Sequence, residues 1–195
     1  MTQIDSTSRT GRAGRVLVVA LGCLALPACY DFPVPLDPEP KLKLDARLLD
    51  AWLCLPAEPA VPPDLRVRPA EDDRVIALKF EGANLKYKIK MVGMDKPDEE
   101  SFWGGYASEL GDRTVLNLWA ISEKPQEDPA KVTLVNYSFL SKNVVQFDLI
   151  DEKPLKEKPL SPSSELRKTL LAHRPPDELF EPFMVCVRAK IEDPS

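Results

Sequence analysis

The sequence contains a single histidine, His173, and none of the motifs that usually mark an enzyme. It has no Gly-x-Ser-x-Gly elbow, no phosphate-binding glycine loop and no His-x-x-His or His-Glu-x-x-His zinc motif. His173 follows a predicted helix, where a surface histidine caps the C-terminus because its cation interacts well with the helix dipole. We therefore expect a protein that is not an enzyme and uses no metal or cofactor.

Basic residues are also too few for a nucleic-acid-binding protein. The formal charge is −5, and it becomes −7 without the three arginines and one aspartate of the first 28 residues. An anionic domain repels phosphate backbones, so no nucleic-acid partner is expected. The acidic clusters at 71–73 and 98–100 fall in predicted loops. We interpret them as solvated charge rather than as weak calcium sites.

The chain has no apolar run long enough to span a bilayer, which takes about 20 residues. Its longest run covers 11 residues, 16–26, and three arginines precede it: Arg9, Arg12 and Arg15. A short apolar run after positive charge is typical of an export signal. We predict that residues 1–28 are a signal peptide.

Residues Leu26-Pro27-Ala28-Cys29 resemble the lipobox of bacterial lipoproteins. The resemblance implies a diacylglycerol on the Cys29 thiol, cleavage before Cys29 and a lipid-anchored protein outside the cytoplasm. Tyr30 after the cysteine permits the outer membrane, with the domain facing the periplasm or the cell surface. Two alternatives are lipidation of Cys23 and an ordinary cleaved signal that leaves Cys29 free.

Two cysteines remain for the folded domain, Cys54 and Cys186. An even pair in an oxidising compartment favours a disulfide, here between the first and last predicted strands. The alternative is a pair of free buried thiols. A bridge that closes more than 100 residues contributes roughly 4–5 kcal/mol in the chain-entropy model.

The predicted organisation is a lipidated proline-rich tether at 29–46, a domain at 47–191 and a tail at 192–195. Prolines at 33, 35, 38 and 40 favour extended polyproline II structure, so the tether is predicted to be a semi-stiff stalk up to roughly 50 Å long. The alternative is that Phe32 and Leu36 pack along the domain.

The domain is predicted to be mainly β, an antiparallel eight-stranded meander that closes into a barrel or half-barrel. The clearest strand alternates Leu85, Tyr87, Ile89 and Met91 with three lysines. One helix, capped by Ser161 with Pro162 in its first turn, precedes the last strand. An open sandwich is the alternative architecture. The predicted strands are 48–55, 74–80, 85–91, 101–108, 113–121, 131–140, 143–151 and 183–191.

The two ends of the domain resemble those of the lipocalin family, in which a Gly-x-Trp motif lies on the first strand of the barrel. Asp50-Ala51-Trp52 stands at that place, and Arg188 on the last strand matches the arginine that packs on the tryptophan. The resemblance implies a lipocalin-like barrel over residues 47–191, closed by Trp52 and Arg188. Asp50 replaces the family's glycine, and the family's Thr-Asp-Tyr motif has no counterpart.

Aromatic residues around Gly104-Gly105 are candidates for a ligand pocket, although an ordinary core strand explains them as well. The candidate pocket residues are Tyr87, Phe102, Trp103, Tyr106 and Trp119. We expect a module that binds a small apolar ligand or lipid, which needs a cavity of about 300 Å³ or more. The alternative is a protein-interaction module in envelope assembly, which predicts an exposed apolar patch or an unpaired strand edge instead.

Overall fold

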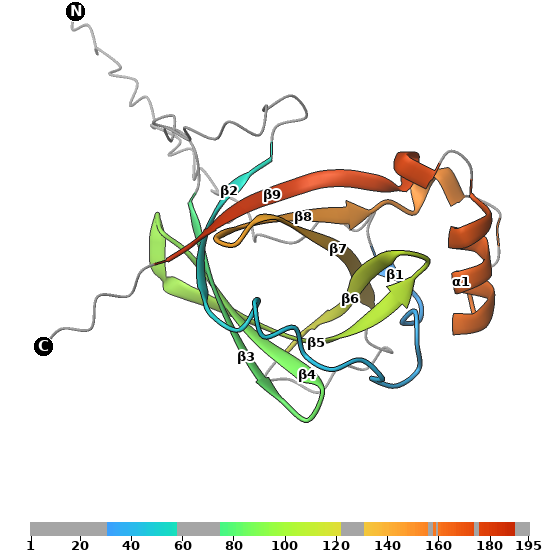
Figure 1. The fold of residues 1–195 in the computed structure, drawn as a ribbon, viewed down its shortest axis with the longest axis horizontal. Helices are drawn as coiled ribbons and strands as arrows, with labels where there is room; N and C mark the ends of the chain where they lie inside the picture. The colour runs from blue at the N-terminus through green and yellow to red at the C-terminus, as the bar shows by residue number, and fades with distance from the viewer. Residues whose placement is uncertain are drawn as a thin grey trace, which may run out of the picture.

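The computed structural model describes residues 31–57, 75–121, 131–155, 158, 160–173 and 176–189. Eight antiparallel strands of this described part form a closed barrel, as predicted and consistent with a lipocalin-like fold (Figure 1). Each strand pairs with the next, and β9 also pairs with β2, which closes the ring. The strands are β2 (Ala51–Pro56), β3 (Ile76–Ala83), β4 (Lys86–Gly93), β5 (Lys96–Leu110), β6 (Arg113–Ala120), β7 (Val132–Ser141), β8 (Val144–Ile150) and β9 (Phe180–Arg188).

The alternation along β4 follows the prediction except at its start. Tyr87 and Ile89 point into the barrel and are buried, whereas Lys86 and Lys88 are exposed. Leu85 was predicted to open the strand, but it lies in the turn before it with a φ of 64°. Asn84, its neighbour, has a φ of 51°. Positive φ at both central residues suits the twist of a two-residue hairpin, so the turn displaces Leu85 from the sheet.

Strand β5 is longer than predicted, because it begins at Lys96 rather than at residue 101. The acidic residues 98–100 therefore lie on a strand and not in a loop. Glu100 pairs with Val92 in the sheet, and its carboxylate is 2.6 Å from the Lys90 amine on the same neighbouring strand.

The helix α1 (Ser163–Ala172) precedes β9, as predicted, but its ends differ from the prediction. Pro162 occupies the N-cap position without a side-chain cap, so Ser161 is not the cap. His173 is the C-cap residue, as predicted, and its amide donates to the Leu170 carbonyl, but it is only 7% exposed and therefore does not lie on the surface. The 3₁₀ turn Pro176–Leu179 returns beside the helix end, and Glu178 comes within 3.4 Å of the His173 ring. No helix in the described ranges is long and apolar enough to cross a membrane.

The domain has one apolar core inside the barrel and a second outside it, where α1 packs against the outer wall (Figure 1). The inner core is centred on Trp52, Phe80 and Phe147. The outer core joins the helix to strands β5 to β8 and to the N-terminal segment. Its buried members are Phe32, Leu36, Leu110, Val115, Val132, Leu134, Ile150, Leu155, Leu166, Leu170 and Leu179.

The proline-rich segment is not a stalk over residues 31–46. Strand β1 (Asp31–Phe32) pairs with β7, and Phe32 and Leu36 are 0% and 1% exposed. The Leu36 amide donates to Asn117 Oδ1 at 2.7 Å, and the Tyr106 hydroxyl donates to the Asp37 carbonyl. Burial of the apolar side chains between the prolines fixes the segment, which confirms the packing alternative. We call residues 31–41 the N-terminal strap.

Candidate functional site

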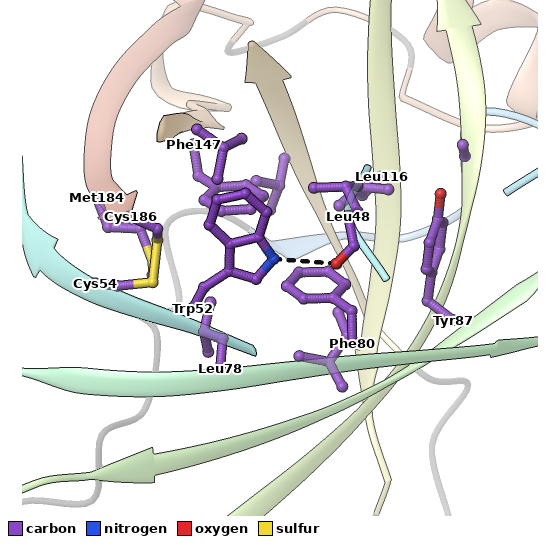
Figure 2. Packing of buried hydrophobic residues seen from close by; sticks show 14 of the residues in the cluster. Leu48, Trp52, Cys54, Leu78, Phe80, Tyr87, Leu116, Phe147, Met184 and Cys186 are labelled. Carbon is purple, nitrogen blue, oxygen red and sulfur yellow. Dashed lines mark hydrogen bonds between the residues drawn. A yellow bond between two sulfur atoms is a disulfide. The ribbon is translucent and has the colours of Figure 1, made fainter. Parts of the chain in front are cut away.

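Residues 42–50 close one end of the barrel, which we call the floor. Leu48 is fully buried there, and its carbonyl accepts a 3.1 Å hydrogen bond from Trp52 Nε1 (Figure 2). The amide of Asp45 donates to the Tyr87 hydroxyl at 2.7 Å. A hydrogen bond from the Arg47 side chain is the main cause that lowers the pKa of Asp45. The floor is thus sealed by both apolar packing and satisfied polar groups.

The predicted contact between Trp52 and Arg188 is present at the floor. The Arg188 guanidinium carbon lies 4.7 Å from the centre of the Trp52 ring. The same guanidinium donates to Asp50 and, at 2.8 Å, to the Arg47 carbonyl. The Ala51 amide and Arg188 both hold the pKa of Asp50 below its usual value. Asp50 is therefore the ionic partner of Arg188.

The predicted disulfide between Cys54 and Cys186 is confirmed, with its sulfurs 2.03 Å apart (Figure 2). The two residues lie directly opposite on β2 and β9, and both are fully buried inside the barrel. The bridge therefore joins the strands whose pairing closes the ring. Cys29 and Cys23, the two candidates for lipidation, lie outside the described residues.

The five candidate pocket residues do not come together. Tyr87 and Trp103 face the barrel interior, Tyr87 near the floor and Trp103 near the opposite end. Phe102, Tyr106 and Trp119 lie on the outer wall, by the alternation of β5 and β6. Tyr106 packs edge-on against Trp119 with the ring centres 5.9 Å apart, and burial raises its pKa to about 12.

The glycine pair accommodates side chains from the neighbouring strand. Gly104 is opposite Trp119, whose indole covers it on the outer wall; a Cβ at Gly104 would lie 2.8 Å from the indole nitrogen. Gly105 is opposite Leu118, which fills the corresponding space inside the barrel. The two glycines therefore admit one large β6 side chain on each face of the sheet.

The end of the barrel opposite the floor, which we call the mouth, holds a cavity of about 60 Å³. Its lining is apolar, and four members are partly exposed: Met91, Trp103, Leu118 and Phe183. The volume is well below the roughly 300 Å³ expected of a ligand pocket. Trp103 Nε1 is buried without an acceptor in the described structure. The other lining residues are Leu78, Phe80, Ile89, Leu116, Val135, Phe147, Leu149 and Met184.

The outer wall carries an apolar surface that the sequence analysis missed. Five aliphatic side chains follow one another in register across β4, β3, β2, β9 and β8, and we call them the aliphatic row. Leu53 and Val187, at its centre, are 38% and 42% exposed. Beside them, Leu55 pairs with Val185 on the same face. The members of the row are Val92, Ala77, Leu53, Val187 and Val144.

The signal for this row is present in the sequence only as alternation along single strands. Strand β9 alternates Val185 and Val187 with the buried Met184 and Cys186, which shows an apolar residue on each face. The continuity of the row depends on the register between five strands, which no single strand reveals.

The described side chains contain no group of three or more histidine, cysteine, aspartate or glutamate residues placed to hold a metal ion. Asp45 and Asp50, two of the four described acids whose pKa is lowered, are engaged by arginines at the floor. No family model matches the chain, and neither a curated protein nor a solved structure is significantly similar to it.

Proposed function

We propose that the protein is a lipid-anchored lipoprotein of the cell envelope whose barrel is an interaction module for another envelope protein. The aliphatic row carries this proposal. The strap and α1 cover the outer wall over β5 to β8, whereas the row leaves Leu53 and Val187 exposed on β2 and β9. Apolar side chains that are contiguous across neighbouring strands, unlike single exposed ones, are typical of a binding surface.

The border of the row favours a protein partner over a lipid surface. Lys79 is ion-paired with Glu81 at 2.9 Å, and Lys90 with Glu100 at 2.6 Å, all on β3 to β5 beside the row. An apolar centre within a rim of both charge signs is the usual anatomy of a protein interface. The expected partner therefore presents an apolar strip with charges of both signs around it.

The size of the row indicates a weak or transient contact. Five neighbouring strands span about 19 Å across the sheet at about 4.8 Å per step. A strip of that length and one side chain wide covers a smaller area than a standard stable interface, which buries about 800 Å² per partner. Confinement of both proteins to one membrane compensates, because it raises their effective concentration. The lipid on Cys29 is therefore part of the proposed binding mechanism.

A second candidate function is the binding of a small apolar ligand or lipid at the mouth. The apolar lining favours it, and so does the indole N–H of Trp103, which has no acceptor among the residues that the structure describes. The cavity of about 60 Å³ requires that the barrel open further or that most of the ligand stay outside. Native mass spectrometry of protein extracted from membranes detects such a ligand as added mass beyond the anchor.

The interaction proposal is tested by the particle mass of the full-length protein, extracted in mild detergent at its natural level. One variant combines Leu53→Glu with Val187→Glu, and its matched control is Leu85→Glu, an exposed leucine in the β3–β4 turn. We expect the wild type and the control to carry one additional protein, and the double variant to run as a single folded chain. The proposal is contradicted if the wild type has the mass of a single chain or of a multiple of this chain. It is also contradicted if the wild type, the control and the double variant all form the same complex.

A further inference from the structure

The strap begins at the mouth of the barrel. Asp31 pairs with Thr133 and Phe32 with Val132, which is the first residue of β7. The meander places the start of β7 at the same end as the close of β6 and the start of β9, where Leu118 and Phe183 line the cavity. The chain therefore enters the fold beside the cavity, at the opposite end from the floor.

Only Tyr30 separates Asp31 from Cys29. Two residue steps span at most about 7 Å, compared with roughly 50 Å for the stalk that the proline pattern predicts. We propose that the mouth rests on the bilayer, with the cavity facing the lipid and the floor pointing away; this rests on the lipid anchor proposed above.

The mouth has the side chains that a bilayer interface accepts. Ile121, which follows β6, is 48% exposed, and Met91 and Phe183 are partly exposed at the cavity. Trp103 lies among the cavity residues, and its buried N–H lacks an acceptor in the described structure. Tryptophan is enriched at membrane interfaces, where its ring meets hydrocarbon and its N–H meets a headgroup oxygen.

The acidic side chains near the mouth determine which lipid headgroup charge is favoured. The hairpin between β4 and β5 carries four exposed acids, Asp95, Asp98, Glu99 and Glu100. Lys96 and Lys90 are ion-paired with Glu99 and Glu100, so these six side chains have a net charge of −2. Carboxylates are repelled by an anionic leaflet, whose surface potential is negative. The expected surface is therefore a zwitterionic phospholipid bilayer, and anionic lipid weakens the contact.

This orientation leaves the aliphatic row on the side wall of the barrel. The row crosses the strands on the outer face, so a mouth on the bilayer does not cover Leu53 and Val187 at its centre. A partner in the same membrane then meets the row sideways. The membrane contact and the protein contact thus use different surfaces.

Tryptophan quenching by nitroxide-labelled lipids tests the orientation in the full lipidated chain, reconstituted in phosphatidylcholine vesicles. One variant keeps only Trp103, at the mouth, and the matched variant keeps only Trp52, at the floor; phenylalanine replaces the other tryptophans. We expect roughly a twofold or greater loss of Trp103 emission, because Asp31, where the chain enters the fold at the mouth, is at most about 7 Å along the chain from the lipid-bearing cysteine. Trp52 emission stays nearly unchanged, and anionic vesicles reduce the loss at Trp103.

A second arm avoids substitutions in the core. A Gly-Ser linker is inserted after Tyr30 in the otherwise wild-type chain, and we expect it to abolish the quenching while the lipid stays attached. Equal quenching of Trp103 and Trp52, or quenching that the linker does not change, overturns the orientation. Mass spectrometry of the same samples separates the two proposals, because a chain without lipid refutes the anchor itself.

Discussion

Replacement of Phe32 by alanine tests whether the strap is part of the fold. The Phe32 ring is 0% exposed in the outer core, on a two-residue strand paired with β7. Truncation of a buried phenylalanine removes its transfer free energy and leaves a cavity, which together cost about 3–5 kcal/mol. Since domains are stable by only about 5–15 kcal/mol, the variant is expected to lose a large part of its stability.

The assay is urea denaturation monitored by circular dichroism. The protein is a chain that begins at residue 29 and carries Cys29→Ser. The matched control is Val34→Ala, which truncates a partly buried strap residue packed against the same core. We expect the control to lose about 1–2 kcal/mol, because Val34→Ala removes fewer buried carbon atoms than Phe32→Ala does.

The alternative reading of the strap gives a different result. A free stalk contributes nothing to the free energy of unfolding, so Phe32→Ala would then match the wild type. A loss below about 0.5 kcal/mol, within the range of ordinary surface substitutions, refutes the packing of the strap. If Phe32→Ala only makes residues 31–41 more sensitive to protease and leaves the free energy of unfolding unchanged, the strap does not unfold cooperatively with the barrel.

Three further predictions concern the barrel. Joint replacement of Cys54 and Cys186 by alanine lowers the free energy of unfolding by roughly 4–5 kcal/mol in urea, because the bridge spans 132 positions; an unchanged midpoint contradicts this. Burial raises the pKa of Tyr106 to about 12, so its contribution to stability is complete below pH 10 and is lost as pH rises toward about 12. Tyr106→Phe flattens alkaline unfolding over that interval, and an unaltered pH profile counts against the burial. Gly105→Ala places a Cβ against Leu118 and lowers the free energy of unfolding by about 1–3 kcal/mol, as measured by thermal unfolding. An unchanged free energy of unfolding contradicts this and shows that Leu118 on β6 can move aside.

The sequence was informative about the barrel because its signals are local. Period-two alternation located the strands, and the Trp52 and Arg188 pair placed the closing strands side by side, which the structure confirms. The pairing of Cys54 with Cys186 was predicted because the export-signal and lipobox hypotheses left only these two cysteines for the domain, and the structure confirms the disulfide. Errors of one to several residues at strand ends arise where turns, as at Asn84 and Leu85, set the boundary.

The parts that the sequence did not reveal depend on tertiary contacts. Alternating prolines predict an extended strap but not whether Phe32 and Leu36 meet a complementary surface. Likewise, the aromatic cluster predicted one pocket, but alternation sends Trp103 inward and Tyr106 outward from the same strand. The aliphatic row needed the register of five strands, which is fixed only when the ring closes.

The lipid on Cys29 is the premise shared by the proposed function and the membrane orientation. Cells fed a labelled fatty acid test it directly, with the Cys29→Ser and Cys23→Ser chains compared beside the wild type. The account predicts label on the wild type and on Cys23→Ser, and none on Cys29→Ser. An unlabelled wild type, or a Cys29→Ser chain that is still labelled, contradicts it.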